Sequence, residues 1–530
     1  MLTRSGQGYA HFLMETVFPR RRLMRIAASA GAALALSTPA ASAAAKAWEQ
    51  DSVSRVQRPA GSLHRREGSP VLSLGHFDLA EQGYVAEEYF LEGTAAVFDL
   101  DGAMRVDGLW TVRSGASKPY RVRLVIVRPA DQDRFSGTAV VEWINVSAGG
   151  DAAPGWITMH REAIRAGHAW VAVSAQKVGI DGGNGLNLGV APLKQASPER
   201  YASLDHPGDS FAFDIFAQAG QAVRGNAESL FGGAGLKRLI AFGASQSAWF
   251  LTSYVNAVAP LDAAFDGYFL QARFSGAAPL RDPNIFGDLA LPGTRLRDDL
   301  PYPVLVVESE TDIVGEGISQ GGYAAARQPA NDRLRVWEIA GASHADLSIF
   351  AVANADTDSL PAAKRIRLWK PSRSLFGAMI DVPVNSAPQQ YYMMNAALRA
   401  MASWIAGGKA PAQGEPIRTI SSMDTFPIVA RDALGRAEGG IRSPWADAPV
   451  MIHSGASKLT HPIGRLVGAS RPLSAAELAG LYPLGEEQYL AAFEASLDEA
   501  VASGYFIPAQ REEIMGLAAA AWAWAQAGEF

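Results

Sequence analysis

The sequence predicts an α/β fold in which helices flank a mostly parallel central sheet, with long insertions that form a lid and a C-terminal helical extension. Two observations lead to this prediction. Short apolar runs alternate with amphipathic stretches of helical length between about residues 139 and 406, an order typical of a parallel sheet covered on both faces. Hydrophobic residues make up 48% of the chain and charged residues 19%, which indicates a globular protein with a sizeable core.

Six apolar runs are the predicted strands, and each has the length of a buried strand bounded by turn residues. They cover residues 139–144, 169–174, 238–242, 267–271, 303–307 and 334–339. Four stretches with helical periodicity are the predicted helices, and they lie near residues 156–166, 209–224, 247–258 and 388–406. Residues 48–130, which come before this alternation, contain mostly short extended segments.

The first 43 residues resemble an export signal. Arginines at 20–22 precede an apolar stretch, residues 26–36, and a small-residue cleavage site follows at 41–43. The apolar stretch is too short to span a bilayer, so we expect cleavage and no transmembrane anchor afterwards. The arginines resemble a twin-arginine signal, although Pro19 stands where Ser or Thr is usual, and an ordinary secretory signal is the alternative. A periplasmic or secreted protein is expected.

Long loops and a change of pattern suggest how the remaining chain is organised. We expect residues 44–410 to form an α/β core. Residues 176–207 and 345–387 are inserted loops with little periodicity, and loops of this length in a compact domain are usually lids or binding loops. Residues 411–530 are expected to form a C-terminal extension packed on the core.

Charge and cysteine content exclude several classes of function. The chain carries a formal net charge of −6 and no evident basic patch, which argues against a nucleic-acid partner. It has no cysteine, so disulfides, a Cys nucleophile and thiolate metal sites are excluded. Most of its histidines lack the spacing of metal ligands, namely His160, His168, His206, His453 and His461. We therefore expect neither a metal nor another cofactor.

The pentapeptide Gly243-Ala244-Ser245-Gln246-Ser247 lies between an apolar run and an amphipathic stretch. A tight turn between a strand and a helix forces a serine side chain out above the sheet edge, where it can act as a nucleophile. The sequence therefore predicts Ser245 as a catalytic nucleophile.

A second segment, Gly317-Ile318-Ser319-Gln320-Gly321, matches the literal pattern G-x-S-x-G better. No strand run leads into it, and glycines continue where a helix would have to begin. Since the pattern carries meaning only in its strand-turn-helix context, we expect Ser319 to lie in a loop without a catalytic role.

A serine hydroxyl needs a base to take its proton, and the base needs an acid to orient it. His344 follows the last predicted strand and is the candidate base. Two carboxylates, Glu310 and Asp312, follow the strand before it. Asp312 is the favoured acid because it lies a few residues past the strand, and Glu310 is the alternative. The order Ser, Asp, His differs from that of the two other common catalytic triads.

The oxyanion that forms on the substrate needs two backbone donors. One is expected from Gln246, the residue after the nucleophile. The other is expected from the Gly-rich loop at residues 145–150, which follows the first strand of the alternation. Within that loop Asn145 and Val146 are the candidates, and an ordinary Gly-rich turn is the alternative.

These residues resemble the α/β-hydrolase superfamily, and more narrowly a bacterial group of alpha/beta hydrolase domain-containing proteins. The matching segments are residues 141–147, 243–247, 310–312, 341–344 and 437–442. Ser247 replaces the last Gly of the general superfamily pattern, and Gly-x-Ser-Gln-Ser is what we expect in the narrower group. The resemblance covers about residues 55–520 and implies an α/β-hydrolase fold and an esterase-like hydrolase.

The sequence thus predicts an exported serine hydrolase that cleaves small-molecule or lipid-like carboxylic esters through an acyl-enzyme. A lipase, a polyester depolymerase or an acyltransferase of the same mechanism is the alternative among enzymes. A non-catalytic binding protein with this fold is the alternative outside enzymes, because a fold alone does not determine function.

Overall fold

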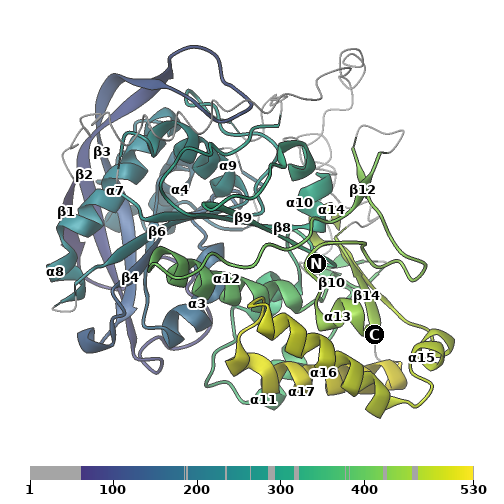
Figure 1. Ribbon diagram of the computed structural model, residues 1–530. Helices are drawn as coiled ribbons and strands as arrows, with labels where there is room; N and C mark the ends of the chain where they lie inside the picture. Colours follow the sequence, from purple (N-terminus) through teal and green to yellow (C-terminus); the bar gives the residue numbers. More distant parts are fainter. Residues whose placement is uncertain are drawn as a thin grey trace, which may run out of the picture.

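A computed structural model describes residues 61–528, except 184, 187–188, 233–234, 263, 285–292, 316–320, 376–377, 381, 422–425 and 456–463. The predicted export signal and Ser319 lie outside the described residues. At the centre is a nine-stranded sheet in the order β1-β2-β3-β5-β4-β6-β7-β8-β9 (Figure 1). Its strands are β1 (Ser62–Arg66), β2 (Tyr84–Leu100), β3 (Val112–Pro129), β4 (Thr138–Trp143), β5 (Ala169–Val173), β6 (Arg238–Ala244), β7 (Gly267–Gln271), β8 (Val304–Ser309) and β9 (Leu334–Ile339).

The strands β4 to β9 pair in parallel, and they occupy the six predicted runs. The α/β fold class is therefore confirmed. Helices cover both faces of these strands, which explains why they are apolar throughout rather than alternating. In β4, Val141 packs in the core on one face and Val140 in the core on the other. The first core contains α7 (Ala212–Gly225) and α9 (Gln246–Ser253), and the second contains α3 (Pro154–Arg165) and α12 (Gln389–Ile405).

The region before β4 forms a long antiparallel hairpin, β2 with β3, instead of the short extended segments expected from the sequence. The hairpin continues through Gly93 and Pro119, residues that usually weaken a strand. Gly93 has a packing reason, because a Cβ at this position would lie 2.8 Å from the side-chain oxygen of Gln218 on α7. The hairpin joins the parallel strands through an antiparallel pairing of β3 with β5.

The order of the strands contains a switch point beside β4. The strand β5 pairs with one edge of β4 and β6 pairs with the other, so the chain leaves these strands in opposite directions. Ligands of open α/β sheets bind in the crevice at the carboxyl ends of the strands at such a point. The segments that follow β4 and β6 contact each other at the carboxyl ends of these strands. They are the two segments in which the sequence places the oxyanion donors and the nucleophile.

The two predicted lid loops contain short elements, and their role as lids stays a prediction. The first holds α4 (Lys177–Asp181), α5 (Leu193–Ala196) and α6 (Pro198–Tyr201), and the second holds α11 (Ala362–Leu368) and the hairpin β10 (Ser374–Leu375) with β11 (Ala378–Met379). Two short helices lie elsewhere, α8 (Ala227–Phe231) after α7 and α10 (Glu310–Val314) directly after β8.

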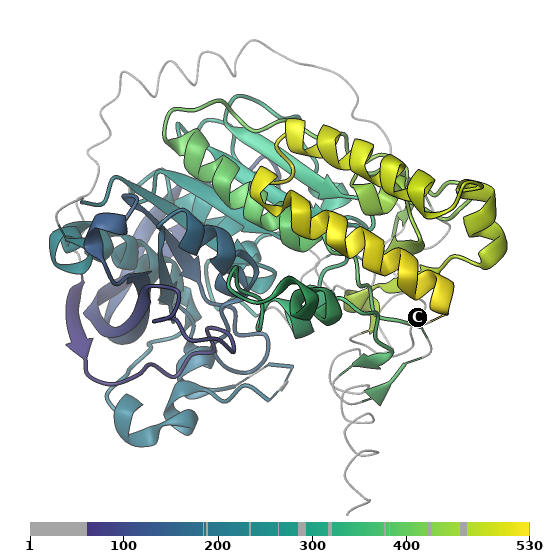
Figure 2. The same ribbon diagram turned by 90° about the horizontal axis from the view of Figure 1, so that it is seen from below.

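The C-terminal region contributes to the second core. Its long helices α16 (Glu486–Ala502) and α17 (Arg511–Ala527) lie alongside α12 in Figure 2, and Phe493 and Leu517 share one apolar cluster with Trp156 of α3. Among the described residues, no helix combines the length and hydrophobicity needed to cross a membrane. The other elements of this region are β12 (Thr419–Ile420), β13 (Ile428–Val429), α13 (Pro444–Asp447), β14 (Met451–Ser454), α14 (Gly464–Val467), β15 (Ala469–Pro472) and α15 (Ala475–Leu481).

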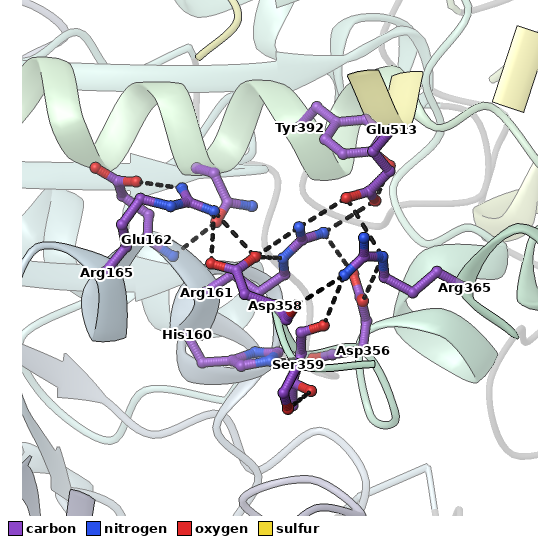
Figure 3. A network of polar contacts seen from close by, with 12 residues as sticks. His160, Arg161, Glu162, Arg165, Asp356, Asp358, Ser359, Arg365, Tyr392 and Glu513 are labelled. Atoms are coloured by element: carbon purple, nitrogen blue, oxygen red, sulfur yellow. Dashed lines mark hydrogen bonds and ion pairs between the residues drawn. The ribbon is translucent and has the colours of Figure 1, made fainter. Parts of the chain in front are cut away.

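A buried charge network joins α17 to the α/β core (Figure 3). Arg161 on α3 donates to Asp356 Oδ2, to Asp358 Oδ1 and to Glu513 Oε2, each at 2.8 Å. The hydroxyl of Tyr392 on α12 donates to Glu513 Oε1 at 2.5 Å. Arg161 is only 4% exposed, so its charge depends on these carboxylates for compensation. The network therefore links α3, α12, α17 and the second insertion around one guanidinium group.

We expect Arg161→Met to lower the free energy of unfolding by about 3–5 kcal/mol, because it removes the cation closest to the buried carboxylates of Asp356 and Glu513. These carboxylates then keep only the longer contacts with Arg365, at 3.9 and 3.4 Å. Arg399→Met is the matched control. Arg399 pairs with Glu162 at 2.8 Å, but its side chain is 46% exposed, so its loss is expected to cost less than about 1 kcal/mol. Denaturant unfolding of both variants measures the difference. Equal effects of the two substitutions would contradict a structural role for the network.

Candidate active site

Ser245 lies in a sharp turn between β6 and α9. Its backbone has φ 58° and ψ −120°, a left-handed conformation that is rare for residues with a side chain. The Ser245 N–H donates to the Gln271 carbonyl at 2.9 Å, which ties the turn to β7. A Cβ on Gly243 would lie 2.7 Å from the Ser247 carbonyl oxygen, so the turn requires glycine at position 243. The turn exposes part of the Ser245 side chain, in the setting described for a nucleophile.

His344 and Asp312 form a hydrogen-bonded chain with this serine. Ser245 Oγ lies 2.9 Å from His344 Nε2, and His344 Nδ1 lies 2.6 Å from Asp312 Oδ1. Since the anionic oxygen of Asp312 accepts the Nδ1 proton, Nε2 is left free to accept the serine proton. The structure thus brings together the three residues that the sequence selects as nucleophile, base and acid. Their catalytic roles stay a prediction.

The carboxylate of Asp312 is fixed by the start of α10. Its second oxygen, Oδ2, accepts from the backbone N–H of Ser309 at 2.9 Å and from the Ser309 hydroxyl at 2.6 Å. Ser309 and Asp312 form a capping box, in which each side chain satisfies a backbone donor of the other residue. The Asp312 side chain is 1% exposed. The contacts with Ser309 therefore hold Oδ2, and Oδ1 is the oxygen that contacts the imidazole.

Glu310, the alternative acid, makes other contacts. Its Oε1 accepts from the Gly341 N–H at 2.7 Å. Its Oε2 accepts from Arg431 Nη2 at 2.7 Å and from the Gly455 N–H at 2.9 Å. Glu310 therefore binds the first turn of the loop that carries His344 and connects that loop to the C-terminal region. In the described structure it is Asp312, and not Glu310, that contacts the imidazole.

Other residues of the C-terminal half also hold the His344 loop. The Thr311 hydroxyl accepts from the His344 N–H at 3.2 Å and donates to the Gly455 carbonyl at 2.7 Å. Asn385 Nδ2 donates to the Gly341 carbonyl at 2.8 Å. The ring of Phe274 stacks on the imidazole with centroids 6.3 Å apart. Thr311 stands between the two carboxylates that the sequence selects, which is a weak signal for a role at the site. Nothing in the sequence points to Asn385, because its contacts join distant segments.

Two buried carboxylates, Glu308 and Asp346, lie within four residues of Asp312 and His344, respectively, in the chain. Burial, and to a lesser degree the charge of Asp312, raises the pKa of Glu308 well above its usual range. Burial raises the pKa of Asp346 to about 7. Burial also lowers the pKa of the nearby Arg273, which packs over the Tyr323 ring. The raised pKa favours the neutral form of Glu308, and the neutral form adds no second negative charge next to Asp312.

The backbone N–H groups of the expected oxyanion donors differ in whether they already have a hydrogen-bond acceptor within the protein. Gln246 is the first residue of α9, and an N–H in the first turn of a helix has no intrahelical acceptor. The Asn145 N–H donates to the Ala152 carbonyl at 3.0 Å, so it is not available to a substrate, and the expectation of Asn145 as a donor needs correction. Val146, whose N–H donates to no other described residue, is the remaining candidate of the two.

Within the described ranges no group of three or more His, Cys, Asp or Glu side chains is arranged to hold a metal ion. The described site contains a partly exposed serine hydroxyl, an imidazole and a carboxylate in one hydrogen-bonded chain. This arrangement can perform nucleophilic attack on a carbonyl with general base assistance.

Comparisons with known proteins place the chain in a family. A search of curated protein sequences finds no significant match. Among solved structures, a serine hydrolase from Xanthomonas campestris described as lacking a lid is 14% identical, covers 46% of this chain and 83% of its own, and has a TM-score of 0.25. A Rhizomucor miehei esterase is 17% identical, covers 53% of this chain and 81% of its own, and has a TM-score of 0.27.

A glucuronoyl esterase from Solibacter usitatus is 10% identical, covers 53% of this chain and 81% of its own, and has a TM-score of 0.28. These TM-scores are too low to carry an argument about function. The family assignment depends instead on the sequence, since the family model described as alpha/beta hydrolase domain matches residues 54–516. The chain belongs to this alpha/beta hydrolase domain family.

Proposed function

We propose that the protein is an exported serine hydrolase that cleaves carboxylic esters through an acyl-enzyme. The observation that carries this proposal is the continuous chain of short contacts from Ser245 Oγ to His344 Nε2 at 2.9 Å and from His344 Nδ1 to Asp312 Oδ1 at 2.6 Å. The family assignment supports a hydrolase of this fold. Export is supported only by the first 43 residues of the sequence.

In the first half of the proposed reaction, Ser245 Oγ attacks the ester carbonyl while His344 Nε2 takes its proton. Asp312 holds the imidazole in the tautomer that accepts at Nε2 and stabilises the imidazolium that forms. The carbonyl oxygen becomes an oxyanion and accepts from the Gln246 and Val146 amides. His344 then donates the proton to the leaving alcohol oxygen, the ester C–O bond breaks, and the acyl group stays on Ser245.

In the second half, His344 takes a proton from water, and the resulting hydroxide oxygen attacks the acyl carbonyl. The same two amides stabilise the second oxyanion. Collapse of this intermediate returns the proton to Ser245 Oγ and releases the carboxylic acid. The acyl acceptor alone distinguishes a hydrolase from an acyltransferase of the same mechanism, and substrate size distinguishes an esterase from a lipase or polyester depolymerase.

A binding protein without catalysis is the second candidate from another class. An intact contact chain argues against it, because a protein that only binds has no need for a buried acid orienting a histidine toward a serine. The partly exposed Ser245 beside a base is the feature that favours an enzyme.

We expect Ser245→Ala to lower kcat for a p-nitrophenyl ester by on the order of 10⁶-fold, the loss typical for removal of a catalytic serine. Reaction of the purified mature protein with a fluorophosphonate probe is expected to disappear in the same variant. Ser319→Ala, which removes the serine of the more literal motif, is the matched control and should keep both signals. Labelling that survives Ser245→Ala but disappears in Ser319→Ala would contradict the proposal, and absence of labelling in the folded wild type would favour the binding protein.

We expect Asp312→Asn to lower kcat by about 10³–10⁴-fold, because an amide at this position favours the wrong imidazole tautomer. Glu310→Gln keeps one acceptor oxygen but places an amide NH2 against the second N–H partner, either Gly341 or Gly455. It is expected to lower kcat less than about 10-fold, with a lower melting temperature. Steady-state kinetics and thermal unfolding of both variants separate the two roles. A larger loss of kcat in Glu310→Gln than in Asp312→Asn would make Glu310, and not Asp312, the catalytic acid.

A further inference from the structure

Two side-chain hydrogen bonds join the loop after β4 to the turn that carries Ser245, and a third lies within the loop. Asn145 Nδ2 donates to the Ala244 carbonyl at 3.1 Å. Asn145 Oδ1 accepts from the Ser147 N–H at 2.8 Å, and the Ser147 hydroxyl donates to Gln246 Oε1 at 3.1 Å. Asn145 is 8% exposed and Gln246 is 5% exposed. We call these bonds the loop clamp.

The clamp lies between the two candidate oxyanion donors. Val146 belongs to the loop after β4, and Gln246 belongs to the first turn of α9. The pairing of β4 with β6 ends at Trp143 opposite Gly243, so the sheet does not itself fix the distance between the two amides. Beyond that pair, Asn145 and Ser147 supply side-chain hydrogen bonds between the two described segments, and the first of these bonds ends on the carbonyl of the residue before Ser245.

We propose that Asn145 is a positioning residue that sets the separation of the Val146 and Gln246 amides, with Ser147 and the Gln246 side chain completing the clamp. This inference depends on the proposed function, because it assigns a task in the same reaction. Asn145 suits the task because its amide donates through nitrogen and accepts through oxygen at once. An ionised carboxylate, which only accepts, or an apolar side chain there loses at least one of the two bonds.

The consequence is specific to the transition state. An oxyanion exists only after the serine has attacked, so amides that are displaced from their positions weaken the tetrahedral intermediate and leave ester binding unchanged. Complete loss of one oxyanion donor lowers kcat by about 10²–10³-fold. Asn145→Ala keeps both backbone amides and removes only the side-chain hydrogen bonds that hold their segments. We therefore expect a smaller decrease in kcat, about 10–100-fold, with KM unchanged.

The test compares catalysis with the affinity of a tetrahedral analogue. The probe is an alkyl trifluoromethyl ketone, whose carbonyl carbon forms a bond to the serine oxygen and whose carbonyl oxygen becomes the oxyanion. Asn145→Ala is expected to weaken its inhibition constant by the same factor as it lowers kcat. The midpoint of the pH profile of kcat/KM is expected to stay where it is in the wild type, since the contacts of His344 and Asp312 are not changed.

Asn395→Ala is the matched control. Asn395 is fully buried between α3 and α12, where its Nδ2 donates to the Thr158 and Tyr391 carbonyls and its Oδ1 accepts from the Glu162 N–H. Its loss is expected to lower the melting temperature while kcat and the inhibition constant stay within about twofold of the wild type, because a structural asparagine far from the turn has no effect on the oxyanion.

Ser147→Ala provides a second variant in case Asn145→Ala does not fold, because it removes one hydroxyl at a partly exposed position. It is expected to lower kcat and the ketone affinity together by about 3–10-fold, since it removes one of the hydrogen bonds. The same substitution in a Gln246→Ala background is expected to add nothing, because Ser147 acts through that side chain.

Unchanged kcat and ketone affinity in Asn145→Ala, or an effect confined to KM, would overturn the inference while leaving the proposed function intact. Independent effects of Ser147→Ala and Gln246→Ala would also overturn it. A folded wild-type protein that neither hydrolyses esters nor binds the ketone would instead overturn the proposed function, and the clamp with it.

Discussion

The site depends on one constraint, the left-handed backbone at Ser245. This conformation turns the chain sharply between β6 and α9, and α9 starts at the next residue, Gln246. The same conformation explains two features of the surrounding residues. Gly243 has no room for a Cβ against the Ser247 carbonyl, and the Ser245 N–H needs the Gln271 carbonyl of β7 as its partner. Strained residues of this kind persist only where the surroundings hold them.

The remaining parts of the site reach this turn from two sides. The strand order brings the loop after β4 next to it, and the loop clamp connects the two segments. On the other side, β8 and β9 deliver Asp312 and the loop of His344, and contacts from Glu310, Asn385 and the region around Gly455 hold that loop. The C-terminal half of the chain therefore supports the proposed base directly, in addition to covering the second core.

The sequence was sufficient for the parts that depend on local pattern. Apolar runs bounded by turns located the six parallel strands, and the position of a serine, a carboxylate and a histidine after three of them selected the residues that the structure brings together. It was insufficient where contacts join distant segments, as between Glu310 and Arg431. The sequence was also insufficient to tell which of two neighbouring backbone N–H groups, those of Asn145 and Val146, already has an acceptor in the fold. Asn145 was a plausible donor from the sequence, but its N–H pairs with Ala152 and its side chain belongs to the clamp.

The most direct test of this account is a crystal structure of the mature protein after reaction with an alkyl phosphonofluoridate. We expect a phosphorus atom bonded to Ser245 Oγ, with the phosphoryl oxygen within hydrogen-bond distance of the Gln246 and Val146 amides and with His344 Nε2 next to the bonded oxygen. A phosphonyl group on another residue would contradict the account. A phosphoryl oxygen that points away from both amides would contradict its description of the oxyanion site.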